Sequence, residues 1–338
     1  MKMKIYSVIL ALFIVTLPSA VFGQVELTRF AGRGKVGTTG FQFLKIGVGA
    51  RAVAMSESFI AMANDATAMY YNPAGMTQMV DNEVVVSLIK WPADIQYGFV
   101  GAAMPTALYG TIGVFVGTLT TGDMKRTVPY KDWNGEYFSA TDWVAGVSYS
   151  RALTDKFSIG GNIKYIGEFL DTESVQSWAV DFGTLFDIGV RKMKFAMMIT
   201  NFGPNLKFLN EEFSLPITFK IGAIVEAFNW NNNILMVTAE GSHPNDNLEQ
   251  FAMGLEYSFM NKLFLRGGYR AFMKLEDKDK TVQLGRDKFI DVEEPLEGFS
   301  FGGGINIPIG GAHAKLDYAY SDLGYLQNAQ RLTVTFNF

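Results

Sequence analysis

The sequence predicts an all-β protein, an antiparallel transmembrane β-barrel of about fourteen strands that follows a short, partly helical element. Three observations carry this prediction: a leader typical of exported proteins, alternation of apolar and polar residues from Asn82 to the last residue, and a scarcity of charge. Of the 338 residues, 49% are hydrophobic and 14% aromatic, but only 18% are charged. Soluble domains usually have about 25% charged residues. The net charge of −4 argues against a nucleic acid as partner.

The first 23 residues have the features of a cleaved signal peptide. Lys2 and Lys4 provide the basic start, Ile5 to Leu17 form the apolar run, and the cleavage site follows Gly23. An N-terminal membrane anchor is the alternative, but the run is shorter than the roughly 20 residues of a spanning helix. We therefore expect an exported protein.

Two short segments separate the leader from the barrel. Residues 24–40 are polar and rich in glycine, which predicts a flexible lead-in. Residues 41–80 are rich in alanine, methionine and glycine, and Ala50 to Ala63 has a composition that favours helix. Because Asn64-Asp65 and Asn72-Pro73 are turn signals, we expect a small, partly helical element here.

From residue 81 to 338 the pattern is that of strands with one apolar and one polar face. At the C-terminus, Leu332, Val334 and Phe336 alternate with polar neighbours. Aromatic residues collect at strand ends and glycines recur on the polar face, as expected for a barrel in lipid with a crowded lumen. A secreted β-sandwich is the alternative, because its wet face would show the same alternation. We favour the membrane barrel.

An even number of strands suits antiparallel closure. The strand-like segments lie near residues 83–90, 94–104, 109–120, 137–150, 156–168, 173–189, 192–200, 216–227, 232–241, 248–259, 262–273, 296–306, 311–321 and 329–338. Longer polar insertions interrupt the rhythm at 122–138 and 275–298, and the second is expected to be an extracellular loop. Thr154-Asp155 and Met260-Asn261 are then periplasmic turns.

The polar face also carries charged residues, which we expect to pair within the lumen because uncompensated charge is costly where water is scarce. They are Asp142, Lys164, Asp181, Asp187, Lys315, Asp317 and Arg331.

The residues give little support for an enzyme or for a metal or cofactor site. There is no cysteine, and the two histidines, His243 and His313, are about seventy positions apart. No Ser/His/Asp grouping is visible. Gly47-x-Gly49 and the glycines at 302–304 lack the lysine-serine ending of a phosphate loop. We therefore expect no catalytic, cofactor-binding or metal-binding residue.

Three motifs follow one another in residues 41–75. They are FLKIGVGARA at Phe43 to Ala52, DATA at Asp65 to Ala68, and NPAG at Asn72 to Gly75. Further matches lie at residues 121–124, 161–165 and 201–203. The ordered series resembles the PorV/PorQ family of outer-membrane proteins, which is related to the FadL-type fatty-acid transporters. It departs at Met55-Ser56-Glu57, where members often have Met-Gly-Gly or Met-Gly-Glu.

The resemblance implies a fourteen-stranded barrel in the outer membrane, with residues 41–80 folded into or against the lumen as a plug. The turn formed by Asn72, Pro73, Ala74 and Gly75 would seat the plug, with Asp65 and Arg51 as polar anchors to lumenal charge. We interpret this turn as a structural seat, not as a ligand-contacting site.

The resemblance also implies two roles. The preferred one is association with type IX secretion, in which the protein binds or shuttles secreted cargo at the cell surface and passes it to the secretion machinery. The alternative is a FadL-like channel for hydrophobic small molecules. Outer-membrane lipid is expected around the barrel in either case. Phe338 would be the terminal signal that the barrel-assembly machinery recognises.

Overall fold

The computed structural model describes residues 37–338 except 107, 128–134, 209–210, 273–280, 284–288 and 292–297. The predicted signal peptide, residues 1–23, and the lead-in up to residue 36 lie outside the described residues.

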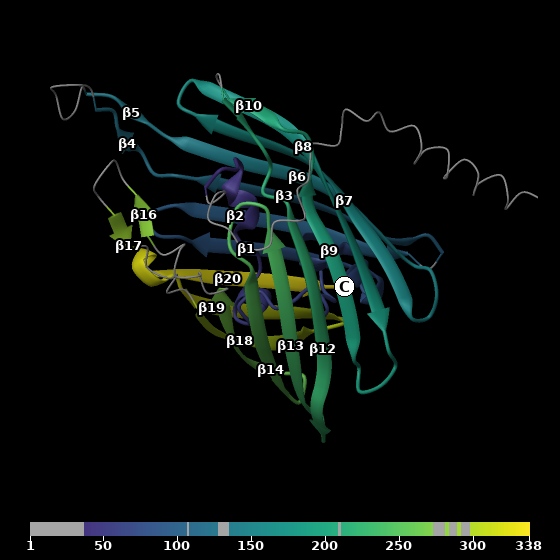
Figure 1. Ribbon diagram of the computed structural model, residues 1–338. Coiled ribbons are helices and arrows are strands. Elements are labelled where there is room, and N and C mark those ends of the chain that lie inside the picture. The colour runs from purple at the N-terminus through teal and green to yellow at the C-terminus, as the bar shows by residue number, and fades with distance from the viewer. Residues whose placement is uncertain are drawn as a thin grey trace, which may run out of the picture.

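Fourteen antiparallel strands form a closed barrel, as the alternation predicts (Figure 1). The barrel closes where β1 pairs with β20, from Glu83 opposite Asn337 to Lys90 opposite Gln330. The strands are β1 (Glu83–Lys90), β2 (Gln96–Thr106), β3 (Gly110–Thr120), β6 (Ala140–Ala152), β7 (Phe157–Leu170), β8 (Glu173–Asp187), β9 (Lys194–Phe202), β12 (Thr218–Trp230), β13 (Asn233–Pro244), β14 (Gln250–Phe259), β15 (Leu263–Phe272), β18 (Phe299–Ile309), β19 (Ala312–Asp322) and β20 (Asn328–Asn337).

The two ends of the barrel differ. At one end, which we call the loop end, the long connections carry three small hairpins, each a two-stranded sheet separate from the barrel sheet. They are β4–β5 (Met124–Lys125 and Tyr137–Phe138), β10–β11 (Leu206–Phe208 and Glu211–Phe213) and β16–β17 (Thr281–Gln283 and Phe289–Asp291). The predicted insertions therefore each contain a hairpin, and the insertion between β9 and β12 was not predicted.

At the other end, the turn end, short turns connect the strands. Asn231 and Asn232 have φ of 48° and 61°, and Met260 and Asn261 have φ of 51° and 55°. Two successive residues in the left-handed region give the tight turn whose twist matches a β-hairpin. Thr154-Asp155 lies at this end too, so the two turns expected to be periplasmic share one end.

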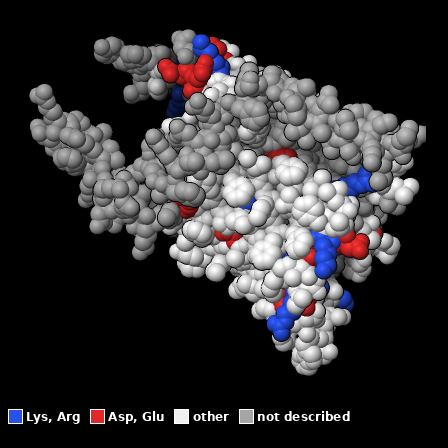
Figure 2. All heavy atoms as spheres, turned by 45° about the vertical axis from the view of Figure 1, so that its right-hand side comes forward, with Lys and Arg blue, Asp and Glu red and all other residues white. Residues whose placement is uncertain are grey.

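The outer face of the barrel is apolar. Along β14, Phe251, Met253 and Leu255 are 61%, 67% and 49% exposed, whereas the residues between them are buried. On the face of the molecule in Figure 2, most described residues are uncharged and the charged ones lie in small groups. The predicted alternation is confirmed, with its apolar side outward, where a bilayer would contact it.

The plug, residues 41–80, lies inside the barrel, where its short helices are seen in purple in Figure 1. Its elements are η2 (Gln42–Lys45), α2 (Ala50–Val53), α3 (Ala68–Tyr71) and η3 (Pro73–Gln78). Most of their buried side chains form one cluster with inward-facing wall residues such as Tyr97, Phe99 and Phe115, whereas Ala50 and Val53 of α2 pack in a second cluster with Ala319 of β19. Within the part of the chain that the structure describes, no helix combines the length and apolar composition of a membrane crossing.

The helix-friendly stretch from Ala50 to Ala63 does not form one helix. The α2 helix ends at Val53, because Ser56 and Glu57 have φ of 52° and 62°, which a right-handed helix cannot accommodate. Glycine adopts this backbone conformation without strain, whereas Ser56 and Glu57 adopt it at a cost.

Lumenal glycines allow the plug to approach the wall closely. A Cβ atom added at Gly268 would lie 2.7 Å from the Cα of Met55, and one added at Gly254 would lie 2.7 Å from the Cβ of the same residue. Gly160 and Gly183 similarly face Pro73-Ala74 and Asn72. The glycines on the polar face are therefore contact points for the plug.

We expect Gly268→Val to destabilise the protein by about 1–3 kcal/mol, because the new side chain overlaps the backbone of Met55. The temperature at which the folded, fast-migrating gel species is lost measures the effect. Gly267→Val is the matched control, since a Cβ there points outward and meets nothing within 4 Å. An equal loss of stability in both variants would contradict the close contact.

Candidate functional site

A cavity of about 530 Å³ lies between the plug and the barrel wall. Its lining includes Trp91, Asn247 and Leu323, which belong to connections at the loop end. The cavity therefore faces the end with the long insertions. Its volume lies within the range of small-molecule sites, roughly 300–1,000 Å³.

The lining mixes apolar and charged side chains. Leu44, Ile46, Tyr70 and Tyr71 come from the plug, and Trp91, Phe272, Leu323 and Leu326 come from the wall and its connections. Five cationic and four anionic side chains also contribute: Lys45, Lys164, Lys220, Arg270, Arg331, Glu57, Asp181, Glu240 and Asp322. Such a lining suits a molecule with both an apolar body and a polar group.

Most of the charged side chains that line the cavity form ion pairs with one another. Lys164 lies 2.7 Å from Asp181, and Lys220 lies 3.2 Å from Glu240. Glu240 also accepts the backbone N–H groups of Phe59 and Ile60 at 3.0 and 3.2 Å, so it connects β13 to the plug.

Glu57 of the plug points into this charged surface. Its Oε2 lies 3.1 Å from Nη2 of Arg270, and the same nitrogen donates to the carbonyl of Ser56. Burial alone would raise the pKa of Glu57, but the positive charges of Arg270, Lys220 and Arg331 together lower it below its ordinary value. Glu57 is therefore an anion held among cations of the barrel wall.

Arg331 differs from the other cations. It is 2% exposed, its Nε donates to the carbonyl of Gly47 at 3.1 Å, and its Nη1 donates to Ser321 Oγ at 3.1 Å. The guanidinium lies 5.3 Å from the ring centroid of Trp91. Among the described residues, no carboxylate lies within 4.0 Å of it.

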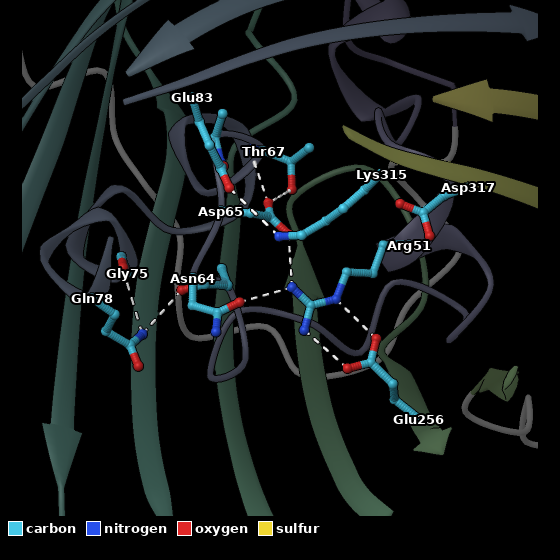
Figure 3. A network of polar contacts seen from close by, with 12 residues as sticks. Arg51, Asn64, Asp65, Thr67, Gly75, Gln78, Glu83, Glu256, Lys315 and Asp317 are labelled. Atoms are coloured by element: carbon cyan, nitrogen blue, oxygen red, sulfur yellow. Dashed lines mark hydrogen bonds and ion pairs between the residues drawn. The ribbon is translucent and has the colours of Figure 1, made fainter. Parts of the chain in front are cut away.

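A second set of charges, which does not line the cavity, joins the plug to the wall (Figure 3). Arg51 donates to both carboxylate oxygens of Glu256 at 2.9 and 3.0 Å, and to Asp65 at 2.7 Å. Arg266 contacts the same Glu256 at 2.6 Å and also Asp317 at 2.5 Å. The structure thus brings the two predicted anchors, Arg51 and Asp65, together. Of these two, Arg51 forms an ion pair with a wall residue, Glu256, whereas Asp65 pairs with Arg51 within the plug.

The Asn72-Pro73-Ala74-Gly75 turn is fully buried. The Asn72 Oδ1 accepts from the N–H of Ala74 at 3.1 Å, and its Nδ2 donates to the carbonyls of Ile60 and Thr184 at 2.9 and 3.1 Å. The turn does not line the cavity. This geometry is that of a seat between plug and β8, and its functional role stays a prediction.

The expected pairing of lumenal charges holds for Lys164, Asp181, Lys315 and Asp317. Within the described part of the chain, Asp142, Asp187 and Arg331 have no ion-pair partner within 4.0 Å, so the expectation is wrong for these three. Sequence reasoning assigned no lumenal role to Glu57, Glu240, Glu256, Arg266 or Arg270, although the last four lie on strands of the predicted barrel.

The remaining predicted positions lie apart from the cavity. His243 contacts Glu249 at 3.1 Å, and the described residues contain no cluster of metal-ligating side chains. Phe338 is 58% exposed, and its backbone pairs with Asn82 at 3.0 and 3.1 Å beside the seam. Its role as an assembly signal stays a prediction.

The start of the plug is fixed to the loop end by Asp246. This carboxylate accepts from Thr39 at 2.5 Å, Gln42 at 2.8 Å and Lys45 at 2.9 Å. Burial opposes ionisation, but hydrogen bonds from Gln42, Thr39 and Lys45 lower the pKa of Asp246 below its ordinary value of about 3.8.

The fold is that of the FadL-type barrels. A deletion mutant of the monoaromatic hydrocarbon channel TodX matches with a TM-score of 0.58 and 13% identity, over 86% of this chain and 98% of that one. The Ralstonia pickettii toluene transporter TbuX matches with a TM-score of 0.57 and 12% identity, over 86% and 97%.

A Pseudomonas aeruginosa FadL homologue matches with a TM-score of 0.51 and 11% identity, over 87% of this chain and 98% of that one. No family model and no curated protein matches the sequence. The comparisons therefore support the FadL-like fold that the resemblance implies. They give no support for the narrower PorV/PorQ family.

Arg51→Met is expected to cost about 3–5 kcal/mol of unfolding free energy, because Asp65 and Glu256 lose a buried cation. Urea unfolding of the folded barrel measures this. Arg126→Met is the control, since Arg126 pairs with Asp171 and Glu136 at the exposed rim and should matter far less. Equal effects would show that the Arg51 contacts contribute no more than a surface pair.

The contacts of Asp246 predict a pH dependence at the start of the plug. Because its pKa is depressed in the folded state, its contribution is complete above about pH 4 and is lost as the pH falls through the folded pKa. Protease cleavage near residues 39–45 should therefore increase in strongly acidic buffer. Asp246→Asn should be cleaved readily already at neutral pH, with a smaller further increase on acidification; identical profiles would contradict the assignment.

Proposed function

We propose that the chain is an outer-membrane channel of the FadL type, which admits small molecules that have an apolar body. The observation that carries this proposal is the cavity of about 530 Å³ between the plug and the wall, facing the loop end. The structural relatives include a toluene transporter and a monoaromatic hydrocarbon channel, which are channels and not enzymes. We infer that solute enters at the loop end.

Three features support the outer membrane as location. The leader predicts export, the outward face of the strands is apolar, and the fold is that of outer-membrane channels. With the loop end outside, the cavity would face the exterior of the cell, and the turn end would face the periplasm.

The cargo-shuttling role is the other candidate, and it rests on the sequence resemblance alone. The long charged insertion at 275–298 motivates it. None of the three structural relatives named above is a secretion component. We therefore favour the channel.

Uptake by whole cells tests the proposal. Cells that contain the protein in the outer membrane should take up at least one of three labelled monoaromatic probes, toluene, benzamide or benzoate, faster than cells without it. If none of the three enters faster, although the protein is present as a heat-modifiable barrel, the channel proposal is wrong.

A disulfide lock tests whether passage needs the plug to move. The Oγ atoms of Thr77 and Ser158 are 3.0 Å apart, between η3 and β7, and the chain has no cysteine of its own. The double variant Thr77→Cys/Ser158→Cys should lose most of its uptake when oxidised and regain it when reduced. The two single variants, treated identically, are the controls, and undiminished uptake by the locked protein would exclude a moving plug.

A further inference from the structure

Among the described residues, one cation of the cavity lining, Arg331, makes no direct ion pair, although Glu57 lies close enough to interact with its charge. Lys164, Lys220 and Arg270 each pair with a carboxylate of the lining, and Lys45 pairs with Asp246 at 2.9 Å. Only Arg331, among the cavity cations that the structure describes, has no carboxylate within 4.0 Å. It is also nearly fully buried, with 2% of its surface exposed.

A buried guanidinium without a partner is costly. Two of its N–H groups donate to neutral oxygens, those of Gly47 and Ser321. A guanidinium has five N–H donors in a planar fork, which fits the two oxygens of a carboxylate. Because Arg331 lines the cavity, its remaining N–H donors are available to a ligand bound there.

The surroundings of Arg331 also indicate the body of the ligand. Trp91 lies against the guanidinium, and Leu323 and Leu326 of the connection between β19 and β20 line the same cavity. Asp322 lines it too and accepts the N–H of Gly324 at 3.0 Å. An acid with a compact apolar body would place its carboxylate on Arg331 and its body against these side chains.

We propose that the cavity is a binding site for a compact organic acid, whose carboxylate is held by Arg331 and whose apolar body packs beside Trp91. This inference deepens the proposed channel function, on which it rests for the route of entry. It distinguishes the ligand from a bare hydrocarbon, because nine charged side chains line the cavity.

Glu57 of the plug competes with such an acid for the same positive charge. It lies 3.1 Å from Arg270 and feels the fields of Lys220 and Arg331. It is also held in a left-handed backbone conformation, with φ of 62°, that a glutamate does not favour. Binding of an acid therefore weakens one contact between plug and wall, and removal of the Glu57 charge strengthens binding of the acid.

Calorimetric titration of the full-length protein in detergent tests the site. The probes are benzoate, benzamide and toluene, since benzamide has nearly the shape of benzoate but no charge. We expect benzoate to bind about tenfold or more tightly than benzamide. Arg331→Met should weaken benzoate by roughly ten- to a hundredfold and change benzamide little, whereas Glu57→Gln should tighten benzoate.

Arg126→Met, at the rim, is the control and should leave benzoate affinity unchanged. Benzamide binding as tight as benzoate, or benzoate affinity unaffected by Arg331→Met, would overturn the inference. If Arg331→Met does not reach the heat-modifiable folded form, the ratio of benzoate to benzamide and the Glu57→Gln variant still decide.

The same probes separate this inference from the channel proposal. Toluene uptake without benzoate binding would overturn the acid site and leave the channel standing. Benzoate binding without any uptake by cells would support the site and overturn the channel.

Discussion

The structure depends on the close contact between the plug and the inner face of the barrel. A barrel of fourteen strands encloses more space than its own side chains fill, and here residues 41–80 fill much of it. Glycines such as Gly160 and Gly268 permit this contact, because any side chain there would occupy the space of the plug backbone. The plug can pack this closely against the wall because small residues face each other on both sides of the contact.

The same confinement determines where charge is placed. Polar groups that leave water inside the barrel must find partners there. Arg51 donates from Nε and Nη2 to the two carboxylate oxygens of Glu256, and Glu240 accepts two backbone N–H groups of the plug. These contacts fix the plug by directional bonds as well as by shape. They also explain the left-handed residues Ser56 and Glu57, since the ion pair to Arg270 and the hydrogen bond to the Ser56 carbonyl compensate for local strain.

Much of the fold could be predicted from the sequence. Strands such as β3, β14 and β20 follow a period of two, and Leu332 to Phe336 is apolar outward as expected. The break after Val53 could not be predicted from composition, because it depends on contacts that Ser56 and Glu57 make with β15 and its connection. The ion-pair partners of the lumenal charges could not be predicted from the sequence either, since Arg51 and Glu256, for example, are 205 positions apart. Alternation places a charge on the inner face, but strand register and plug position decide which charge it meets.

Among the described residues, Arg331 is the cavity cation that makes no ion pair within 4.0 Å. Its neighbours in the cavity show that the fold can supply carboxylates where they are needed, as it does for Lys164, Lys220 and Arg270. Nothing in the geometry of β20 prevents a similar partner on β19, where residue 321 is instead a serine that accepts one N–H at 3.1 Å. A carboxylate at that place would fill the guanidinium fork permanently. Serine holds the side chain in position and leaves its remaining donors for a solute that comes and goes.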